Sequence, residues 1–215
     1  MKEKALIELH YLPSLAYFSL FLQYSMVLDA HEHVEKQSYR NRSHIHTSSG
    51  LGALIVPMVH EKEKIPISQI RIDFGQKWQK NHWGAIQSAY GKAPFFEFYG
   101  GELRECLFSA PSFLFELNLN LLSLCLKWLK LDASPAFSER YHEKGNFPGN
   151  DLRNQIHPKN DETWNQYYHP QPYIQVFGNK FASNLSLMDL IFCQGPEALA
   201  ILREGVRSEK KLKNI

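Results

Sequence analysis

Residues 5–29 are ALIELHYLPSLAYFSLFLQYSMVLD, and their apolar runs, interrupted near Pro13 and Gln23, predict a strand, a helix and a second strand. Ala5–Leu9 is a short apolar run of the kind that forms strands. Pro13 favours a helix start, and the aromatic and aliphatic residues after it predict a helix through about Gln23. Ser25–Asp29 has the composition of the next strand. This order predicts a βαβ unit.

In a βαβ unit the loop after the first strand and the tip of the second strand lie at the same edge of the sheet. We therefore expect Tyr11 and Asp29 to be neighbours. An apolar run such as Leu15–Leu28 also resembles a signal peptide or a membrane helix, but Glu3, Glu8 and Gln23 disfavour both. We expect a core helix that leads into a strand.

The remaining pattern predicts an α/β fold with a small mixed or mostly parallel sheet, a helical middle and a C-terminal helix. The expected helices are Trp78–Ala89, Phe95–Phe108, Ser112–Trp128 and Leu187–Leu202. Further strands are expected at Ala53–Pro57, Ile65–Ile72 and Tyr173–Phe177. The polar segments Ala30–Gly52 and Ala136–Asp161 are expected to be loops, the second with a short ordered piece near Asp151–Ile156. Long loops are often functional, so the first of these is of most interest.

Composition limits the domain organisation and the class of partner. A chain of 215 residues with 44% hydrophobic content predicts one folded unit, residues 1–205, with a basic tail at 206–215. The net charge of +2 disfavours a nucleic-acid partner. Three cysteines, Cys106, Cys125 and Cys193, stand far apart in apolar runs, which is typical of free thiols in the cytoplasm. Neither a P-loop, a dinucleotide fingerprint nor a Gly-x-Ser-x-Gly elbow occurs, and no cofactor is implied.

The segment KQSYRNR, residues 36–42, is a candidate anion-binding site. It combines Lys36, Arg40 and Arg42 with the amides of Gln37 and Asn41. Each guanidinium can bind two oxygens of a phosphate or carboxylate, and the lysine adds a point charge. Two alternatives remain open. The cluster is either solvated loop, or its arginines form buried ion pairs with Asp29, Glu32 and Asp189.

Histidines supply two further candidates. His82, between Trp78 and Trp83, is a candidate general base, although a histidine on an apolar helix face is more often a packed, hydrogen-bonded residue. His31 with His33, and His44 with His46, have the spacing of paired metal ligands next to Asp29 and Glu32. No cysteine-rich or zincin motif supports them, so we predict no metal site.

Several aromatic and polar residues belong to either the core or a site. The aromatic residues Phe95 to Tyr99 favour core, with the Tyr99 hydroxyl as the exposed tip. Gln175, Asn184, Ser186 and Asp189 cluster near the last helix, where Ser186 and Asp189 resemble an N-cap with an acidic first turn.

An ordered set of motifs extends over most of the chain and resembles the WbqC-like family. The motifs are Tyr11-Leu-Pro13, Lys36-Gln-x-Tyr-Arg-Asn-Arg42, Trp78 with His82-Trp83, Ala89-Tyr90, Pro94-Phe-Phe-Glu-x-Tyr99, Tyr173-x-Gln-Val-Phe177 and Asn184-Leu-Ser-x-x-Asp189-Leu. Where many members have Gln-Pro before the tyrosine and Trp after Leu-Pro, this chain has Glu8-Leu9 and Ser14.

The resemblance implies a role in bacterial O-antigen or other surface-polysaccharide biosynthesis, as a transferase of aminoacyl or glycan groups. It implies a phosphate-bearing activated sugar or aminoacyl donor, with Asp29, Glu32 or His82 as the proton acceptor. The residues expected to bind substrate are Tyr11, Lys36, Gln37, Arg40, Asn41, Arg42, Tyr99, Arg153 and Gln175. A non-catalytic partner of a polysaccharide enzyme is the alternative, because no catalytic signature is present.

Overall fold

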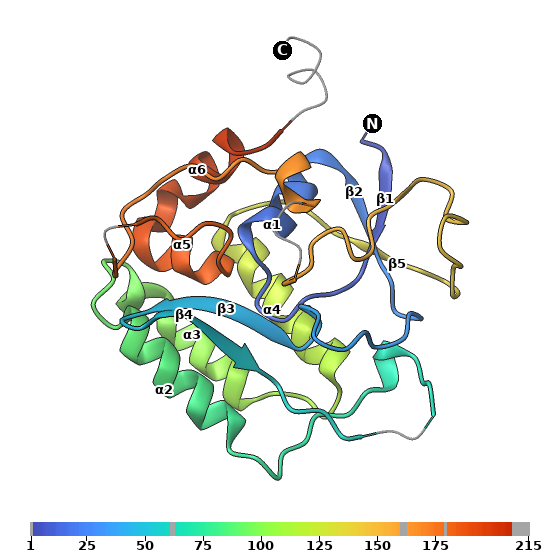
Figure 1. The fold of residues 1–215 in the computed structure, drawn as a ribbon, viewed down its shortest axis with the longest axis horizontal. Coiled ribbons are helices and arrows are strands. Elements are labelled where there is room, and N and C mark those ends of the chain that lie inside the picture. Colours follow the sequence, from blue (N-terminus) through green and yellow to red (C-terminus); the bar gives the residue numbers. More distant parts are fainter. Residues whose placement is uncertain (1, 61–62, 160–162, 179, 208–215) are drawn as a thin grey trace.

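The computed structural model describes residues 2–60, 63–159, 163–178 and 180–207 (Figure 1). Its first three elements are β1 (Lys4–Ile7), α1 (Leu15–Gln23) and β2 (Ser25–Leu28), and β1 pairs in parallel with β2. The predicted βαβ unit is therefore confirmed. Ala5, Leu6 and Ile7 are fully buried, as expected for a strand that is covered on both faces.

Two very short strands complete a parallel sheet of four strands in the order β5-β2-β1-β6. They are β5 (Ala136–Phe137), which pairs with β2, and β6 (Asn150–Asp151), which pairs with β1. Both lie in the segment that the sequence predicts to be loop. Because all four strands run in one direction, their carboxyl ends meet at one edge of the sheet.

An antiparallel hairpin, β3 (Arg42–Thr47) and β4 (Gly50–Ile55), replaces part of the predicted loop Ala30–Gly52. That prediction is wrong from Arg42 onward, because β3 buries only Ser43 and Ile45 and its other residues are polar. β4 begins and ends slightly before the predicted strand Ala53–Pro57. In Figure 1 the hairpin lies across the helical middle of the chain.

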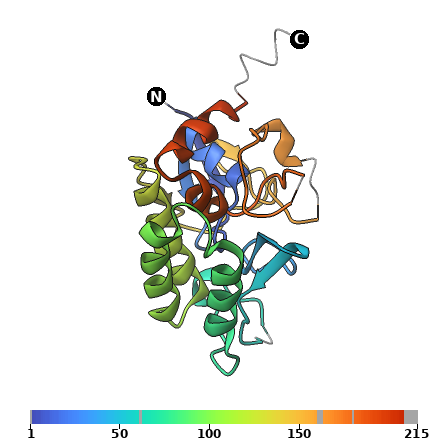
Figure 2. The ribbon, with the colours of Figure 1, turned by 90° about the vertical axis from the view of Figure 1, so that its left-hand side faces the viewer.

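The helical middle is confirmed as α2 (Trp78–Tyr90), α3 (Phe96–Phe108) and α4 (Leu114–Trp128). Figure 2 shows these helices and the hairpin in one half of the molecule, with the βαβ unit and the last two helices in the other half. A continuous hydrophobic core joins the halves, with buried side chains from Ala5 to Leu202. No helix within the described ranges is both long and apolar enough to span a membrane.

Two of the predicted strands are not strands in the structure. Ile65–Ile72 is not a strand; it contains the 3-10 turn η1 (Ile67–Gln69), and Arg71 and Ile72 form only isolated bridges. Tyr173–Phe177 is an irregular segment that side chains hold in position, as described below. Another 3-10 turn, η2 (Thr163–Gln166), precedes it. Most of the basic tail, residues 208–215, lies outside the described residues.

The predicted closing helix is two helices, α5 (Leu187–Gln194) and α6 (Ala198–Glu204), separated by the turn η3 (Gly195–Glu197). Gly195 has a φ of +50°, which side chains rarely adopt, and Pro196 follows it. A Cβ at Gly195 would lie 2.5 Å from the ring of Phe95. The break lets α6 fold back against α1, and the two helices are in contact.

We therefore expect Gly195→Ala to lower the free energy of unfolding by about 2 kcal/mol, from backbone strain and the clash with Phe95. Gly84→Ala is the matched control, since Gly84 is exposed within α2 and a Cβ there meets nothing within 4 Å. The control should gain about 0.5 to 1 kcal/mol from helix propensity. Urea unfolding of both variants measures the two effects. Equal stabilities would contradict the strain at Gly195.

Candidate functional site

Charged and polar side chains gather at the edge where the parallel strands end. Glu8 follows β1, Asp29 follows β2, Ser138 follows β5, and Arg153 follows β6. In open parallel sheets this edge is where ligands bind, at the point where neighbouring connections diverge. Here β2 lies on one side of β1 and β6 on the other, so that point is beside Glu8.

Asp29 ties this edge together. Its Oδ2 accepts from Arg153 Nη1 at 3.0 Å, and its Oδ1 accepts from the hydroxyl of Ser138 at 3.1 Å. Oδ1 also accepts from the backbone N–H groups of His31 and Glu32. The carboxylate is fully buried, so its role in this geometry is to connect β2, β5 and β6.

Arg40 is the most deeply placed cation of the cluster, with a relative exposure of 1%. Its guanidinium forks onto the carboxylate of Glu32, with Nε donating to Oε1 at 2.8 Å and Nη2 to Oε2. Nη1 donates to Oδ1 of Asn154 at 3.0 Å. Of the two alternatives for the arginines of this segment, the buried ion pair therefore describes Arg40 with Glu32. Its guanidinium is not free for a ligand.

The two carboxyl groups near Arg40, those of Glu8 and Glu32, have pKa values that are shifted in opposite directions. Burial raises the pKa of Glu32 to about 7, more than its pairing with Arg40 lowers it. Burial also acts to raise the pKa of Glu8, but the charge of Arg40 and a hydrogen bond from His10 outweigh it and lower that pKa to about 2. Two carboxyl groups with separated pKa values are a typical acid–base arrangement.

An open cleft of about 200 Å³ exposes this cluster to solvent. Glu32 and Arg40 line it together with Lys144, Arg153 and Asn154. Because Glu32 has a relative exposure of only 5%, it presents one carboxylate to the cleft from an otherwise buried position.

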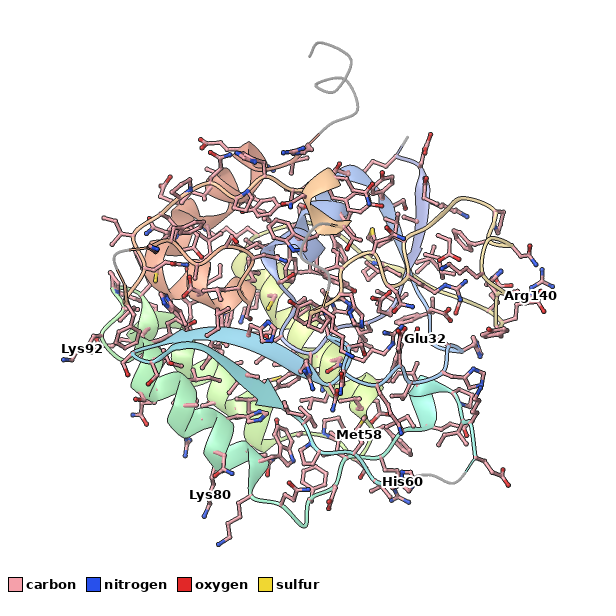
Figure 3. The ribbon with its side chains drawn as sticks, in the orientation of Figure 1. Glu32, Met58, His60, Lys80, Lys92 and Arg140 are labelled. Carbon is pink, nitrogen blue, oxygen red and sulfur yellow. The ribbon has the colours of Figure 1, made fainter. Side chains whose placement is uncertain are left out.

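A second cleft, of about 450 Å³, adjoins the first through His33, which lines both. Lys36 and Lys64 bring positive charge to it, and an apolar floor includes Met58 and Ile70. In Figure 3, Met58 and His60 of the second cleft lie below Glu32 of the first. The two clefts together offer the carboxyl groups of Glu32, Glu35 and Glu63, several cations and an apolar surface.

Tyr11 and His82 lie away from these clefts, in a contact with each other. The Tyr11 hydroxyl is 2.8 Å from Nδ1 of His82, and Nε2 of His82 is 3.2 Å from the carbonyl oxygen of Ile55. Burial lowers the pKa of His82 to about 4, so the imidazole is neutral near pH 7. The hydrogen-bond partner of the Tyr11 hydroxyl is therefore His82, whereas Asp29 is bonded to Arg153 and Ser138.

The remaining predicted residues are dispersed. Lys36 and Gln37 are exposed, and Gln37 has a φ of +60°. Asn41 donates to the carbonyl oxygen of Val56, and Arg42 begins β3, where its Nε is buried without a hydrogen-bond partner. Tyr99 packs edge-on against Trp128. None of these side chains lines the cleft of Glu32.

Near the last helices, Asp189 does not pair with an arginine. It is fully buried, and its Oδ2 accepts from the Tyr173 hydroxyl at 2.6 Å and from Gln175 Nε2 at 3.0 Å. Ser186 stands at the N-cap of α5, but its hydroxyl makes no capping bond. The capping role predicted for these residues is thus replaced by a buried polar cluster. Among the residues that the structure describes, no three His, Cys, Asp or Glu side chains converge as metal ligands would.

Glu8, His10, Asn154 and Lys144 belong to the site but were not predicted. A signal existed for Glu8, because it directly follows a buried strand, as Asp29 does. His10 is fully buried and its Nε2 lies 2.9 Å from Oε1 of Glu8. Asn154 donates its backbone N–H to Glu8 Oε2 at 3.0 Å. The contact between Asn154 and Glu8 joins residues far apart in the chain and leaves no trace in local sequence.

Comparison with known proteins places this geometry in a family. The model of the WbqC-like protein family matches residues 9–161. An uncharacterised protein of Mycobacterium tuberculosis, Rv1507c, is 29% identical over 240 residues, which cover 94% of this chain and 98% of that protein. No solved structure matches the chain.

Replacement of Arg40 tests whether this ion pair holds the site together. We expect Arg40→Ala to lower the free energy of unfolding by about 3 to 5 kcal/mol, because Glu32 and Glu8 then stay buried without their cation. Arg104→Ala is the control, since Arg104 is an exposed residue of α3 that lies over the ring of Phe108. Chemical unfolding should show a change of less than about 1 kcal/mol for the control. A small effect at Arg40 would contradict the structural role.

Glu8 predicts a specific acid sensitivity. Its folded pKa is below the ordinary value of 4.5, so its stabilising contribution is complete above pH 4.5 and is lost as the pH falls toward 2. The stability difference between wild type and Glu8→Gln should therefore shrink by about 2 kcal/mol between pH 5.5 and 3. Unfolding curves at several pH values measure it, with Glu139→Gln, an exposed carboxyl, as the control. A constant difference would show that Glu8 is not the ionised partner.

Proposed function

The chain belongs to the WbqC-like protein family, and from that premise we propose that it is a cytoplasmic transferase of bacterial surface-polysaccharide biosynthesis. Its substrate is a sugar or aminoacyl donor activated by phosphate, and the transfer takes place in the two adjoining clefts. The single observation that carries this proposal is Glu32, a mostly buried carboxylate held by Arg40 at the back of an open cleft.

Glu32 has the properties of a general base. A pKa of about 7 leaves a substantial fraction ionised at neutral pH, and makes proton uptake favourable when an acceptor group loses its proton. The fork from Arg40 fixes the carboxylate in one orientation, which reduces the cost of aligning it with the substrate. Asp29 remains a candidate in the same cluster, although four donors already surround it.

The phosphate of the donor fits the second cleft. Lys36 and Lys64 supply the positive charge there, and the apolar floor suits the organic part of the donor. Arg40 is already paired with Glu32, so the lysines take the role that the sequence motif assigned to three cations. Lys144 lines the first cleft and supplies positive charge near the reacting group, whereas Arg153, which also lines it, is paired with Asp29 and Asp151.

The reaction is a displacement at the activated carbon of the donor. An acceptor hydroxyl or amine forms the new bond to that carbon, and the bond from the carbon to the phosphate oxygen breaks. The acceptor proton moves to a carboxylate oxygen of Glu32, and the phosphate leaves as an anion that Lys36 and Lys64 stabilise. No redox partner is needed.

Calorimetric titration with UDP-N-acetylglucosamine, a glycyl-adenylate sulfamoyl analogue and pyrophosphate tests the donor site. We expect at least one ligand to bind, and Lys36→Ala or Lys64→Ala to weaken it about tenfold, from the loss of one charge-assisted contact. Glu32→Gln should retain donor binding but slow the release of the phosphate leaving group by about 10²-fold or more.

Lys80→Ala is the matched control, because Lys80 is an exposed lysine of α2 on the other side of the molecule from Glu32 (Figure 3). It should bind the donor as the wild type does. The proposal fails if none of the three ligands binds, or if all three lysine variants weaken binding equally. Melting temperatures of the variants distinguish lost contacts from lost folding.

The alternative is a non-catalytic partner of a polysaccharide enzyme. It is supported by large apolar side chains on the surface, of which Ile174 is 85% exposed, Phe98 74% and Leu51 68%. Such a protein would bind another protein and not a phosphate-bearing donor. Failure of every ligand in the titration, together with an unchanged fold in Glu32→Gln, would favour this function.

A further inference from the structure

A separate cleft opens next to Tyr39, the residue before Arg40. Its volume is about 530 Å³, and it lies between the hairpin residue Leu51 and the segment from Trp164 to Asn184. The lining side chains that matter here are Tyr39, Trp164, Phe181, Asn165, Ser183 and Asn184. Neither of the clefts described above includes any of these residues.

The lining combines aromatic rings with neutral hydrogen-bonding groups. The half-buried Phe181 supplies the most accessible ring, backed by Tyr39 and Trp164, which are each 6% exposed, while Asn184 and Ser183 supply an amide and a hydroxyl. None of the described lining residues is Lys, Arg, Asp or Glu, although His169 also lines the cleft and its Nδ1 lies 3.5 Å from Arg207 Nη2. A ligand matched to it is therefore uncharged, rich in hydroxyl groups and apolar on one face, because its ring C–H groups pack on an aromatic surface.

The irregular wall of the cleft is fixed by a buried clamp. Gln175 accepts from the backbone N–H of Ala182 and donates to its carbonyl oxygen, each at 2.9 Å. The same amide donates to Asp189, which also holds the Tyr173 hydroxyl. Ala182 lies between two lining residues, so the clamp holds that wall in place before any ligand arrives.

Asn184 is held in a comparable way. It has a φ of +52°, a backbone conformation that is uncommon outside glycine and that occurs often at functional sites. Its Oδ1 accepts from the backbone N–H of Ala16 at 2.9 Å, at the start of α1. The amide nitrogen is the end of this side chain that remains to donate to a ligand in the cleft.

We propose that this cleft binds a neutral saccharide, with Trp164, Tyr39 and Phe181 as its packing surface and Asn184 as a hydrogen-bond donor. Gln175 and Asp189 are positioning residues that act through Ala182. This site does not rest on the transferase proposed above, because it shares no lining residue with the donor clefts.

Saturation-transfer NMR and calorimetry test the proposal on the full chain. The probes are glucose, galactose, mannose, rhamnose, N-acetylglucosamine, cellobiose and lactose. We expect at least one to bind, Phe181→Ala to weaken it about fivefold, and Ser183→Trp to abolish binding, because the new ring fills the cleft from an exposed position. Gln175→Ala should also weaken binding, since it releases Ala182.

Phe108→Ala is the matched control, since Phe108 is a partly exposed aromatic residue at the end of α3, outside the cleft. It should leave saccharide affinity unchanged. Absence of binding by all seven sugars, or binding that survives Ser183→Trp, would overturn the proposal. Uridine and adenosine are tested in parallel, and binding of a nucleoside alone, sensitive to Phe181→Ala, would identify a nucleoside pocket instead. Lys36→Ala should not alter saccharide affinity, which separates this site from the donor site.

Discussion

The buried guanidinium of Arg40 is the constraint on which the rest of the site depends. A cation with 1% exposure is tolerated only where its hydrogen bonds and its charge are matched, and here the partners come from distant segments. Glu32 belongs to the loop after β2, Asn154 follows β6, and Asn118 of α4 donates to the backbone carbonyl of Arg40 at 2.7 Å. One side chain thus fixes a sheet edge, a loop and a helix relative to each other.

The two carboxyl groups near Arg40 have different pKa values, and this difference suits Glu32 for proton transfer. Glu8 is buried deeper, is hydrogen bonded by His10 and by the backbone of Asn154, and stays ionised. It therefore balances Arg40 permanently. Glu32 is left at the cleft with a pKa of about 7, so it can gain and lose a proton without removing the only counter-charge of Arg40. A structural ion pair and a proton acceptor are compatible in one cluster.

The sequence predicts what short-range pattern determines. The βαβ unit and the helical middle have strong periodicity, and the rule for parallel strand ends directs attention to the loop that carries Asp29 and Glu32. The rest depends on long-range contacts. β5 and β6 have two residues each, too few for any hydrophobic pattern. β3 is hard to recognise from sequence because most of its residues are polar. Glu8 was overlooked because it stands in an apolar run, although burial there is what makes it the partner of Arg40.

The same limit explains why the polar residues near the C-terminus have a different role from the one that their spacing predicts. Ser186 and Asp189 have the spacing of a helix cap, yet Asp189 faces the interior, where Tyr173 and Gln175 both donate to its Oδ2. That cluster substitutes side-chain hydrogen bonds for the strand pairing that Tyr173–Phe177 lacks. Fixed in this way, an irregular segment can shape a cleft as firmly as a strand would. Tyr39 lines that cleft, and the next residue, Arg40, lines the charged cleft of Glu32. Two adjacent backbone positions therefore fix the two clefts relative to each other.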